Sequence, residues 1–159
     1  MGIRIHGKST FASAVMLLSL LSPVLVQAAC SQSDLKGTWF TYSLSVDSFV
    51  TGDPSLTVSS MTNRCKVKVS SSGDIVASKS SCKFRDQVGK DPLNITSGEI
   101  KVNPRCKLNG SITMELIGTS SITLILESGA LAKDKTTFSA VGYSEVEPDV
   151  ITHMTAVKQ

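Results

Sequence analysis

Four cysteines, Cys30, Cys65, Cys82 and Cys106, carry the most reactive side chains of this chain. A cysteine can serve as a nucleophile, a metal ligand or half of a disulfide, and the redox compartment decides among these roles. The spacings lack the close cysteine pairs that structural zinc sites use. The first question is therefore whether the chain folds in an oxidising compartment.

The N-terminal residues follow the order of a secretory signal. Basic residues (Arg4, Lys8) precede an apolar run at 11–21, which Pro23 and a small-residue stretch follow. The run is shorter than the roughly 20 residues that span a bilayer. We expect residues 1–28 to be a signal peptide and residues 29–159 to form one exported domain, periplasmic or extracellular, without a transmembrane segment.

In the oxidising compartment reached by export, we expect the four cysteines to form two disulfides. Four cysteines allow three pairings. Cys65 and Cys82 flank a predicted hairpin of residues 65–69 and 75–81, which would bring them to the same end of adjacent strands. We favour this pairing, with Cys30 joined to Cys106, and the other two pairings stay open. Lipid attachment at Cys30 is a further alternative, although Gln27 occupies the place where such signals usually carry leucine.

The other reactive residues give little support for an enzyme. His153 is the one histidine after the signal, and its alternating position in the last predicted strand is typical of a strand surface. Ser80 and Lys83 match a Ser-x-x-Lys pattern that a serine-rich chain produces by chance, and no Gly-x-Ser-x-Gly elbow is present. We expect no catalytic residues and no enzymatic activity.

Two kinds of charged cluster could be binding sites, but each could also be ordinary solvent-exposed charge. Glu145, Glu147 and Asp149 share one side of an extended segment and could hold a cation, but we favour a solvated loop and expect neither metal nor cofactor. Several basic residues could bind an anionic partner, but we favour solvent-facing sheet charge. These are Lys79, Lys83, Arg85, Arg105 and Lys107. We interpret the chain as bacterial, so the sequon at 94–96 is not expected to carry a glycan.

The net charge also limits the partners. Cleavage after Ala28 leaves 131 of the 159 residues and removes Arg4 and Lys8, which brings the formal net charge from +3 to +1. A nearly neutral chain has no electrostatic reason to bind nucleic acid or an anionic membrane surface.

The exported part reads as an all-β protein because apolar residues alternate with polar ones between glycine, asparagine and serine turns. Strands are predicted at 38–46, 56–60, 65–69, 75–78, 100–103, 111–116, 122–127, 136–143 and 150–157. Residues 84–96 are expected to form a long loop, and a short helix or strand within it stays open. Strands in sequential order with half-buried alternation favour an antiparallel meander that closes into a barrel of about eight strands. A β-sandwich is the alternative fold.

The stretch Leu35-Lys36-Gly37-Thr38-Trp39 resembles the opening Gly-x-Trp motif of the calycins, the lipocalins and avidins. This resemblance implies a calycin-like barrel in which Gly37 and Trp39 are structural and Trp39 closes one end. The chain is also similar to secreted inhibitors of bacterial alkaline metalloproteases, which combine a Leu-x-Gly-x-Trp step with a disulfide across an early hairpin. Those inhibitors reach the protease through a flexible N-terminal segment, which Cys30 would tether here.

These observations support two functional hypotheses. A barrel of about eight strands is filled by side chains or holds one small ligand, and Met61, Met114 and Met154 could line such a cavity. The first hypothesis is therefore a non-enzymatic exported protein that binds a small apolar ligand. The alternative is a protein-interaction or protease-inhibitor module of the cell envelope, whose partner is another exported protein. The sequence identifies neither the ligand nor the partner.

Overall fold

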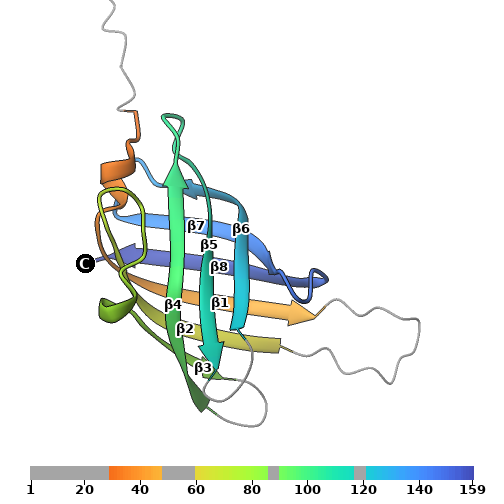
Figure 1. Ribbon diagram of the computed structural model, residues 1–159. Coiled ribbons are helices and arrows are strands. Elements are labelled where there is room, and N and C mark those ends of the chain that lie inside the picture. The colour runs from red at the N-terminus through yellow and green to blue at the C-terminus, as the bar shows by residue number, and fades with distance from the viewer. Residues whose placement is uncertain (1–28, 48–59, 86–89, 117–120) are drawn as a thin grey trace, which may run out of the picture.

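The chain forms a closed antiparallel barrel in which each strand pairs with the next and the last pairs with the first (Figure 1). The computed structural model describes residues 29–47, 60–85, 90–116 and 121–159. Within them the strands are β1 (Gly37–Asp47), β2 (Ser60–Val69), β3 (Ser81–Arg85), β4 (Lys90–Val102), β5 (Lys107–Leu116), β6 (Ser121–Leu131), β7 (Thr137–Ser144) and β8 (Val150–Lys158). Two short 3-10 helices are η1 (Gln32–Leu35) and η2 (Ala77–Lys79). The predicted all-β barrel is confirmed, and the sandwich alternative is wrong.

Two predicted elements between β2 and β5 are wrong. Residues 84–96 are not mainly a loop: they contain the end of β3 and the first half of β4, so the strand left open there is present and longer than expected. Pro92 suggested a break, but it lies near the start of a strand, where a missing N–H is tolerated, and Leu93 and Ile95 point into the core. The expected strand at 75–78 is reduced to a single bridge between Ile75 and Val69, after which the chain enters η2. Most of the predicted strand at 56–60 lies outside the described residues.

Both favoured disulfides are confirmed, although the hairpin used to predict one of them was wrong. Cys65 and Cys82 are direct cross-strand partners on β2 and β3, so the bond joins these adjacent strands one pair from the end of their ladder, with the connecting segment after Lys66, rather than closing a 65–81 hairpin. Cys30 is bonded to Cys106 in the β4–β5 turn. No cysteine of the chain is left free.

The core fills the barrel from the end near η1 toward the middle, with Leu35, Trp39, Val67, Ile100 and Leu126 almost fully buried. Aliphatic side chains from β2, β4, β5 and β6 supply most of it. One strand departs from the usual apolar-in, polar-out alternation. Beyond Trp39, β1 turns Thr41, Ser43 and Ser45 inward, and Phe40, Tyr42 and Leu44 outward. No helix in the described ranges has the length and apolar character needed to cross a membrane.

Candidate functional site

One end of the barrel is sealed by η1 and the tryptophan beneath it. Leu35 and Trp39 have no exposed surface, and Trp39 Nε1 donates a hydrogen bond of 2.7 Å to the Leu35 carbonyl. The Trp39 ring packs on Phe138 with 4.9 Å between ring centroids. The Lys158 ammonium lies 5.5 Å from the centroid of the Trp39 ring and donates to the Asp34 carbonyl. A ligand therefore cannot enter the barrel from this end.

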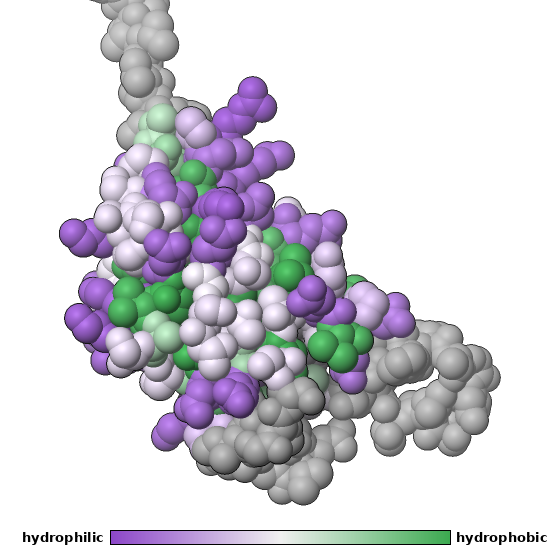
Figure 2. All heavy atoms as spheres, in the orientation of Figure 1, coloured by the Kyte–Doolittle hydropathy of each residue, from purple (hydrophilic) through white to green (hydrophobic). Residues whose placement is uncertain are grey.

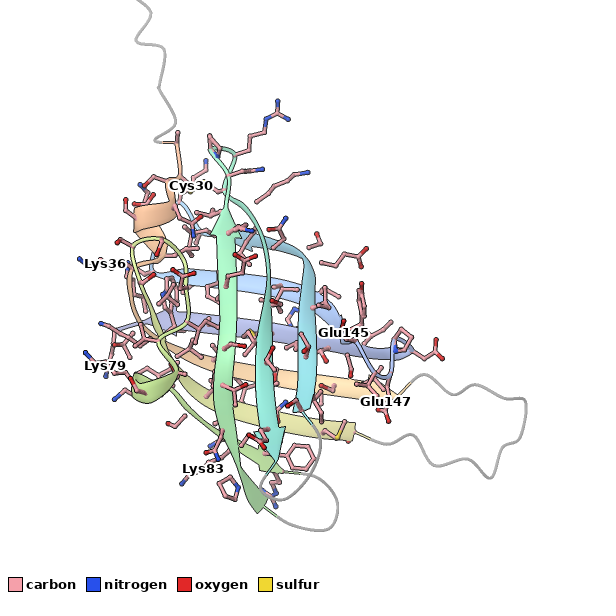
Figure 3. The ribbon with its side chains drawn as sticks, in the orientation of Figure 1. Cys30, Lys36, Lys79, Lys83, Glu145 and Glu147 are labelled. Carbon is pink, nitrogen blue, oxygen red and sulfur yellow. A yellow bond between two sulfur atoms is a disulfide. The ribbon has the colours of Figure 1, made fainter. Side chains whose placement is uncertain are left out.

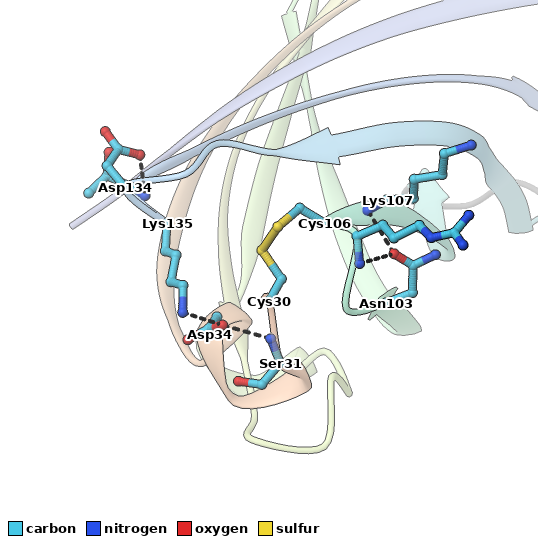
Figure 4. Close-up of a disulfide and its surroundings, with 10 residues drawn as sticks. Cys30, Ser31, Asp34, Asn103, Cys106, Lys107, Asp134 and Lys135 are labelled. Carbon is cyan, nitrogen blue, oxygen red and sulfur yellow. Dashed lines mark hydrogen bonds and ion pairs between the residues drawn. A yellow bond between two sulfur atoms is a disulfide. The ribbon is translucent and has the colours of Figure 1, made fainter. Parts of the chain in front are cut away.

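Polar contacts hold η1 in place at the sealed end. The Gln32 side-chain amide donates to the Ile100 carbonyl and accepts from the Val102 N–H, so it pairs with the backbone of β4. Asp34 forms an ion pair of 2.8 Å with Lys135 and accepts a hydrogen bond from the Ser31 N–H. Figure 4 shows the contacts of Asp34 with Lys135 and Ser31 beside the Cys30–Cys106 disulfide. The Lys135 ammonium and then the Ser31 N–H lower the pKa of the Asp34 carboxyl.

The opposite end, which we call the mouth, contains a cavity of about 120 Å³. Each of the eight strands begins or ends at the mouth, so all of them surround it. The cavity is lined by Ser45, Met61, Asn63, Phe84, Leu93, Met114, Ile122, Leu124, Ser144, Glu147, Val150 and Thr152. This cavity is the candidate functional site.

The two sides of the mouth differ in chemistry. The strands β3 to β6 contribute only apolar side chains, and these are Phe84, Leu93, Met114, Ile122 and Leu124. The strands β7, β8, β1 and β2 contribute the polar groups Ser144, Thr152, Ser45 and Asn63, interrupted by Met61 and Val150. We call the second group the polar wall. A compound that fills this site would therefore contact hydrocarbon on one side and uncharged hydrogen-bonding groups on the other.

The polar wall is only partly paired. Ser45 Oγ and Thr152 Oγ1 share a buried hydrogen bond of 2.8 Å. Asn63 Oδ1 is buried and accepts no hydrogen bond from the described residues, and Thr41 Oγ1, deeper in the barrel, is in the same position. Buried polar atoms are normally paired, so an unpaired acceptor in a cavity wall is a place where a donor from a ligand or a water molecule can bind.

The structure brings two of the three predicted methionines to the cavity. Met61 and Met114 line the mouth, whereas Met154 is 3% exposed and belongs to the filled part of the core. The polar wall was not among the predicted sites. The signal for it was present in the alternation of Thr41, Ser43 and Ser45, whose common side is set by the buried Trp39.

The structure keeps the candidate catalytic residues out of the mouth. His153 is exposed on the outer surface of β8. Ser80 Oγ is held by backbone groups, since it donates to the Val76 carbonyl and accepts from the Lys68 N–H. Lys83 is exposed on β3.

The charged clusters lie at the surface. Glu145, Glu147 and Asp149 are exposed in the segment between β7 and β8, with Glu147 at the rim of the mouth. Among the described residues no group of three or more histidine, cysteine or acidic side chains is arranged to hold a metal ion. Figure 3 shows Lys79 and Lys83 on one side of the barrel and Glu145 and Glu147 on the other.

The remaining candidates are separated from one another. Lys79 ends η2, and Lys83 and Arg85 lie on β3. Arg105 and Lys107 instead lie at the β4–β5 turn, where both backbone N–H groups donate to Asn103 Oδ1. Hydrophilic side chains gather around this turn at the top of Figure 2. Asn94 is exposed on β4.

Comparisons with protein families, curated proteins and solved structures found no match. The closed eight-stranded antiparallel barrel is consistent with a calycin-like fold. The arguments for function therefore rest on the geometry of the barrel itself.

Proposed function

We propose that this protein is an exported, non-enzymatic binding protein that holds the apolar part of a small ligand in the mouth of its barrel. The observation that carries this proposal is the cavity of about 120 Å³ lined mainly by Met, Leu, Ile, Phe and Val. Ligand sites of this kind are apolar and concave with a few placed polar groups. The two disulfides are typical of proteins that fold outside the cytoplasm, which supports export.

The size and chemistry of the mouth limit the ligand. An apolar cavity of about 150 Å³ holds one benzene ring, so the mouth fits a single small ring or a short alkyl group, with any larger ligand projecting outward. Asn63 Oδ1 favours a ligand that donates a hydrogen bond near this apolar part. Glu147 at the rim disfavours a carboxylate by charge repulsion. The ligand class is therefore a small uncharged amphiphile, such as an alcohol or an amide.

Native mass spectrometry of the protein purified from its own compartment tests this proposal, because a bound small molecule would appear as an added mass. A titration with 1-hexanol, followed by amide and methyl NMR shifts, gives a second readout. We expect shifts at Leu124, Met114 and Thr152. Ser144→Phe should abolish them by filling the cavity, whereas Asn94→Phe, on the exposed side of β4, should retain them. A clean unliganded mass together with no hexanol shifts at the mouth would contradict the proposal.

A protein-interaction module is the second candidate function. A protease inhibitor that acts through a flexible N-terminal segment fits poorly, because Cys30 is bonded to Cys106 and its N–H donates to the Pro104 carbonyl. An interaction through the side of the barrel has a specific observation in its favour. The outward residues of β1 and β8 include exposed apolar side chains such as Phe40, Tyr42 and Ile151.

A further inference from the structure

The outer surface of β2, β3 and the short helix η2 carries a concentration of positive charge. Residues 60–85 contain six Lys and Arg and one Asp, which gives this segment a formal net charge of +5. All six cations except the half-buried Lys68 are exposed. The six, which we call the basic face, are Arg64, Lys66, Lys68, Lys79, Lys83 and Arg85.

The basic face does not protect a sheet edge. Cations on an open edge strand discourage pairing with other chains. Both β2 and β3 are paired on each side, so neither of them has an open edge. Arg64 and Lys83 are also direct cross-strand partners, an arrangement of like charges that destabilises a sheet. No acidic side chain of the described residues forms an ion pair with either of them, so this repulsion is not relieved there.

A groove of about 430 Å³ crosses the barrel wall at these cations. Two neighbouring rows of outward side chains line it, and each row runs in register across β8, β1, β2 and β3. The first row is Thr155, Tyr42, Arg64 and Lys83, and the second is Val157, Phe40, Lys66 and Ser81. The groove is therefore mainly apolar and aromatic on β8 and β1, and it carries three cations on β2 and β3.

Arg64 and Tyr42 join the two halves of the groove. The Arg64 guanidinium carbon lies 5.5 Å from the centre of the Tyr42 ring, within the range of a cation–π contact. The apolar half is open to solvent, since Phe40, Tyr42 and Val157 are each 44% to 50% exposed. A partner that fits the whole groove therefore presents negative charge directly beside hydrocarbon.

The charges of the chain are separated across the barrel. Residues 121–150 contain five Asp and Glu and two Lys, a formal net charge of −3, and their strands β6 and β7 lie four places from β2 and β3 in the closed barrel. Figure 3 shows Lys79 and Lys83 on one side and Glu145 and Glu147 on the other. The small net charge of the chain conceals this separation. In the field of an anionic surface, it would turn the basic face toward that surface.

We propose that the basic face and its groove bind the surface of an anionic lipid bilayer. The lysines and arginines contact the lipid phosphates, and Phe40, Tyr42 and Val157 enter the boundary between head groups and acyl chains. Binding of this kind combines buried apolar area with attraction to anionic lipids. A soluble acidic partner would neutralise the cations but leave the apolar half of the groove uncovered. A lipid surface is the partner that supplies phosphate and hydrocarbon side by side.

Cosedimentation with lipid vesicles tests this proposal and does not depend on a ligand at the mouth. The disulfide-bonded protein of residues 29–159 is used, because the apolar run at 11–21 would itself bind lipid. We expect binding to vesicles of equal parts phosphatidylglycerol and phosphatidylcholine, and none to phosphatidylcholine alone. Binding at about 0.05 M salt should be largely lost at about 0.5 M, because salt screens exposed charges.

Lys83→Glu tests the basic face. It should weaken binding to the anionic vesicles by about tenfold or more, since each cation near such a surface adds about fivefold to the affinity and the substitution reverses one. It should not lower the melting temperature, because the new carboxylate would lie opposite Arg64. Lys133→Glu, at an exposed residue between β6 and β7, changes the net charge equally and should leave binding within about twofold.

Val157→Ser tests the apolar half of the groove. It should weaken vesicle binding several-fold, because less hydrocarbon is buried at the lipid boundary. Val146→Ser makes the same substitution at a residue that is 69% exposed among the acidic residues between β7 and β8, and it should have no effect. Circular dichroism and thermal unfolding would show that each variant keeps the barrel.

Three results would overturn the proposal. The first is a wild type that does not sediment with the anionic vesicles at low salt. The second is binding that Lys83→Glu and Lys133→Glu weaken equally, because the contact would then depend only on net charge. The third is binding that depends on Lys83 but not on Val157, which would exclude contact with lipid hydrocarbon and assign the groove to a soluble acidic partner.

Discussion

Ser45 Oγ and Thr152 Oγ1 share a hydrogen bond of 2.8 Å inside the barrel, across the pair of strands that joins the start of the chain to its end. Both residues are almost fully buried, at 6% and 3% exposure. Because β1 and β8 are 107 residues apart at this point, the bond connects distant parts of the chain within the polar wall of the mouth. It is thus both a support for barrel closure and a part of the candidate site.

The two hydroxyls of this pair should not contribute independently to stability. Ser45→Ala leaves Thr152 Oγ1 buried without its partner, and we expect a loss of about 1–3 kcal/mol in the free energy of unfolding. Thr152→Val should cost a similar amount. The double variant should be destabilised by clearly less than the sum of the two, as urea unfolding would show. Strictly additive losses would mean that the two hydroxyls are not coupled.

The two disulfides should contribute unequally to stability. In the chain-entropy model, the Cys30–Cys106 bond closes a loop with a sequence separation of 76 and the Cys65–Cys82 bond one of 17. The expected contributions are about 4–5 and about 3 kcal/mol. Denaturant unfolding of the Cys30→Ser/Cys106→Ser and Cys65→Ser/Cys82→Ser variants measures both. A larger loss from the shorter loop would contradict the entropy argument.

Acid should weaken the attachment of η1 through Asp34. The pKa of this carboxyl is lowered in the folded protein, chiefly by Lys135, so its ionised form stabilises the fold above the unfolded pKa near 3.8. This stabilisation is lost as the pH falls through the lower folded pKa. The melting temperature of Asp34→Asn should therefore lie a few degrees below that of the wild type at neutral pH and coincide with it in strong acid.

Glu99→Gln is the control for the Asp34 prediction. Glu99 also forms an ion pair, with Lys101, but both side chains are largely exposed, so this pair should add little stability at any pH. If the difference in melting temperature between Asp34→Asn and the wild type stays the same in strong acid, the effect of Asp34 is not electrostatic.

Gly73 should resist substitution because of both its backbone and its neighbours. Its φ of +97° favours glycine, and a Cβ there would collide with the Gln32 amide and the Ile100 carbonyl. Gly73→Ala should reduce the unfolding free energy by about 1–3 kcal/mol, whereas the exposed neighbour Ser71→Ala should be close to neutral. Thermal unfolding of both variants gives the comparison. Equal melting temperatures would show that the turn and η1 adjust freely.

The sequence predicted the barrel and the Cys65–Cys82 disulfide because those features depend on local signals, and the Cys30–Cys106 pairing then followed by elimination. Glycine turns and alternation mark the strands, and Cys65 and Cys82 are close enough along the chain to pair across neighbouring strands. It did not predict β4 correctly, because the part of that strand before Gly98 contains Pro92 and a bulge between Ile95 and Ser97, and both features weaken a periodic pattern.

The candidate site was only partly predictable. Met61 and Met114 could be named from their types, but which end of the barrel holds the cavity depends on where η1 packs. The contacts that place η1, from Gln32 to β4 and from Asp34 to Lys135, are long-range. The inward Ser43 and Ser45 and the outward Phe40, Tyr42 and Leu44 of β1 share one cause, the inward position of Trp39. Hydropathy alone would assign Phe40, Tyr42 and Leu44 to the core and Ser43 and Ser45 to solvent.

The seal at the η1 end also contains an intrinsic fluorescent probe, because Trp39 is part of it. Trp39 is the single tryptophan of the chain, so the long-wavelength fluorescence of the folded protein comes from the sealed end alone. Ser45 in the mouth lies six residues further along β1, or about 20 Å away at 3.3 Å per residue. The intensity and wavelength of the Trp39 emission should therefore change when the protein unfolds but not when a small ligand binds in the mouth. A ligand in the mouth that changes this emission would show that binding alters the structure around Trp39 at the other end of β1.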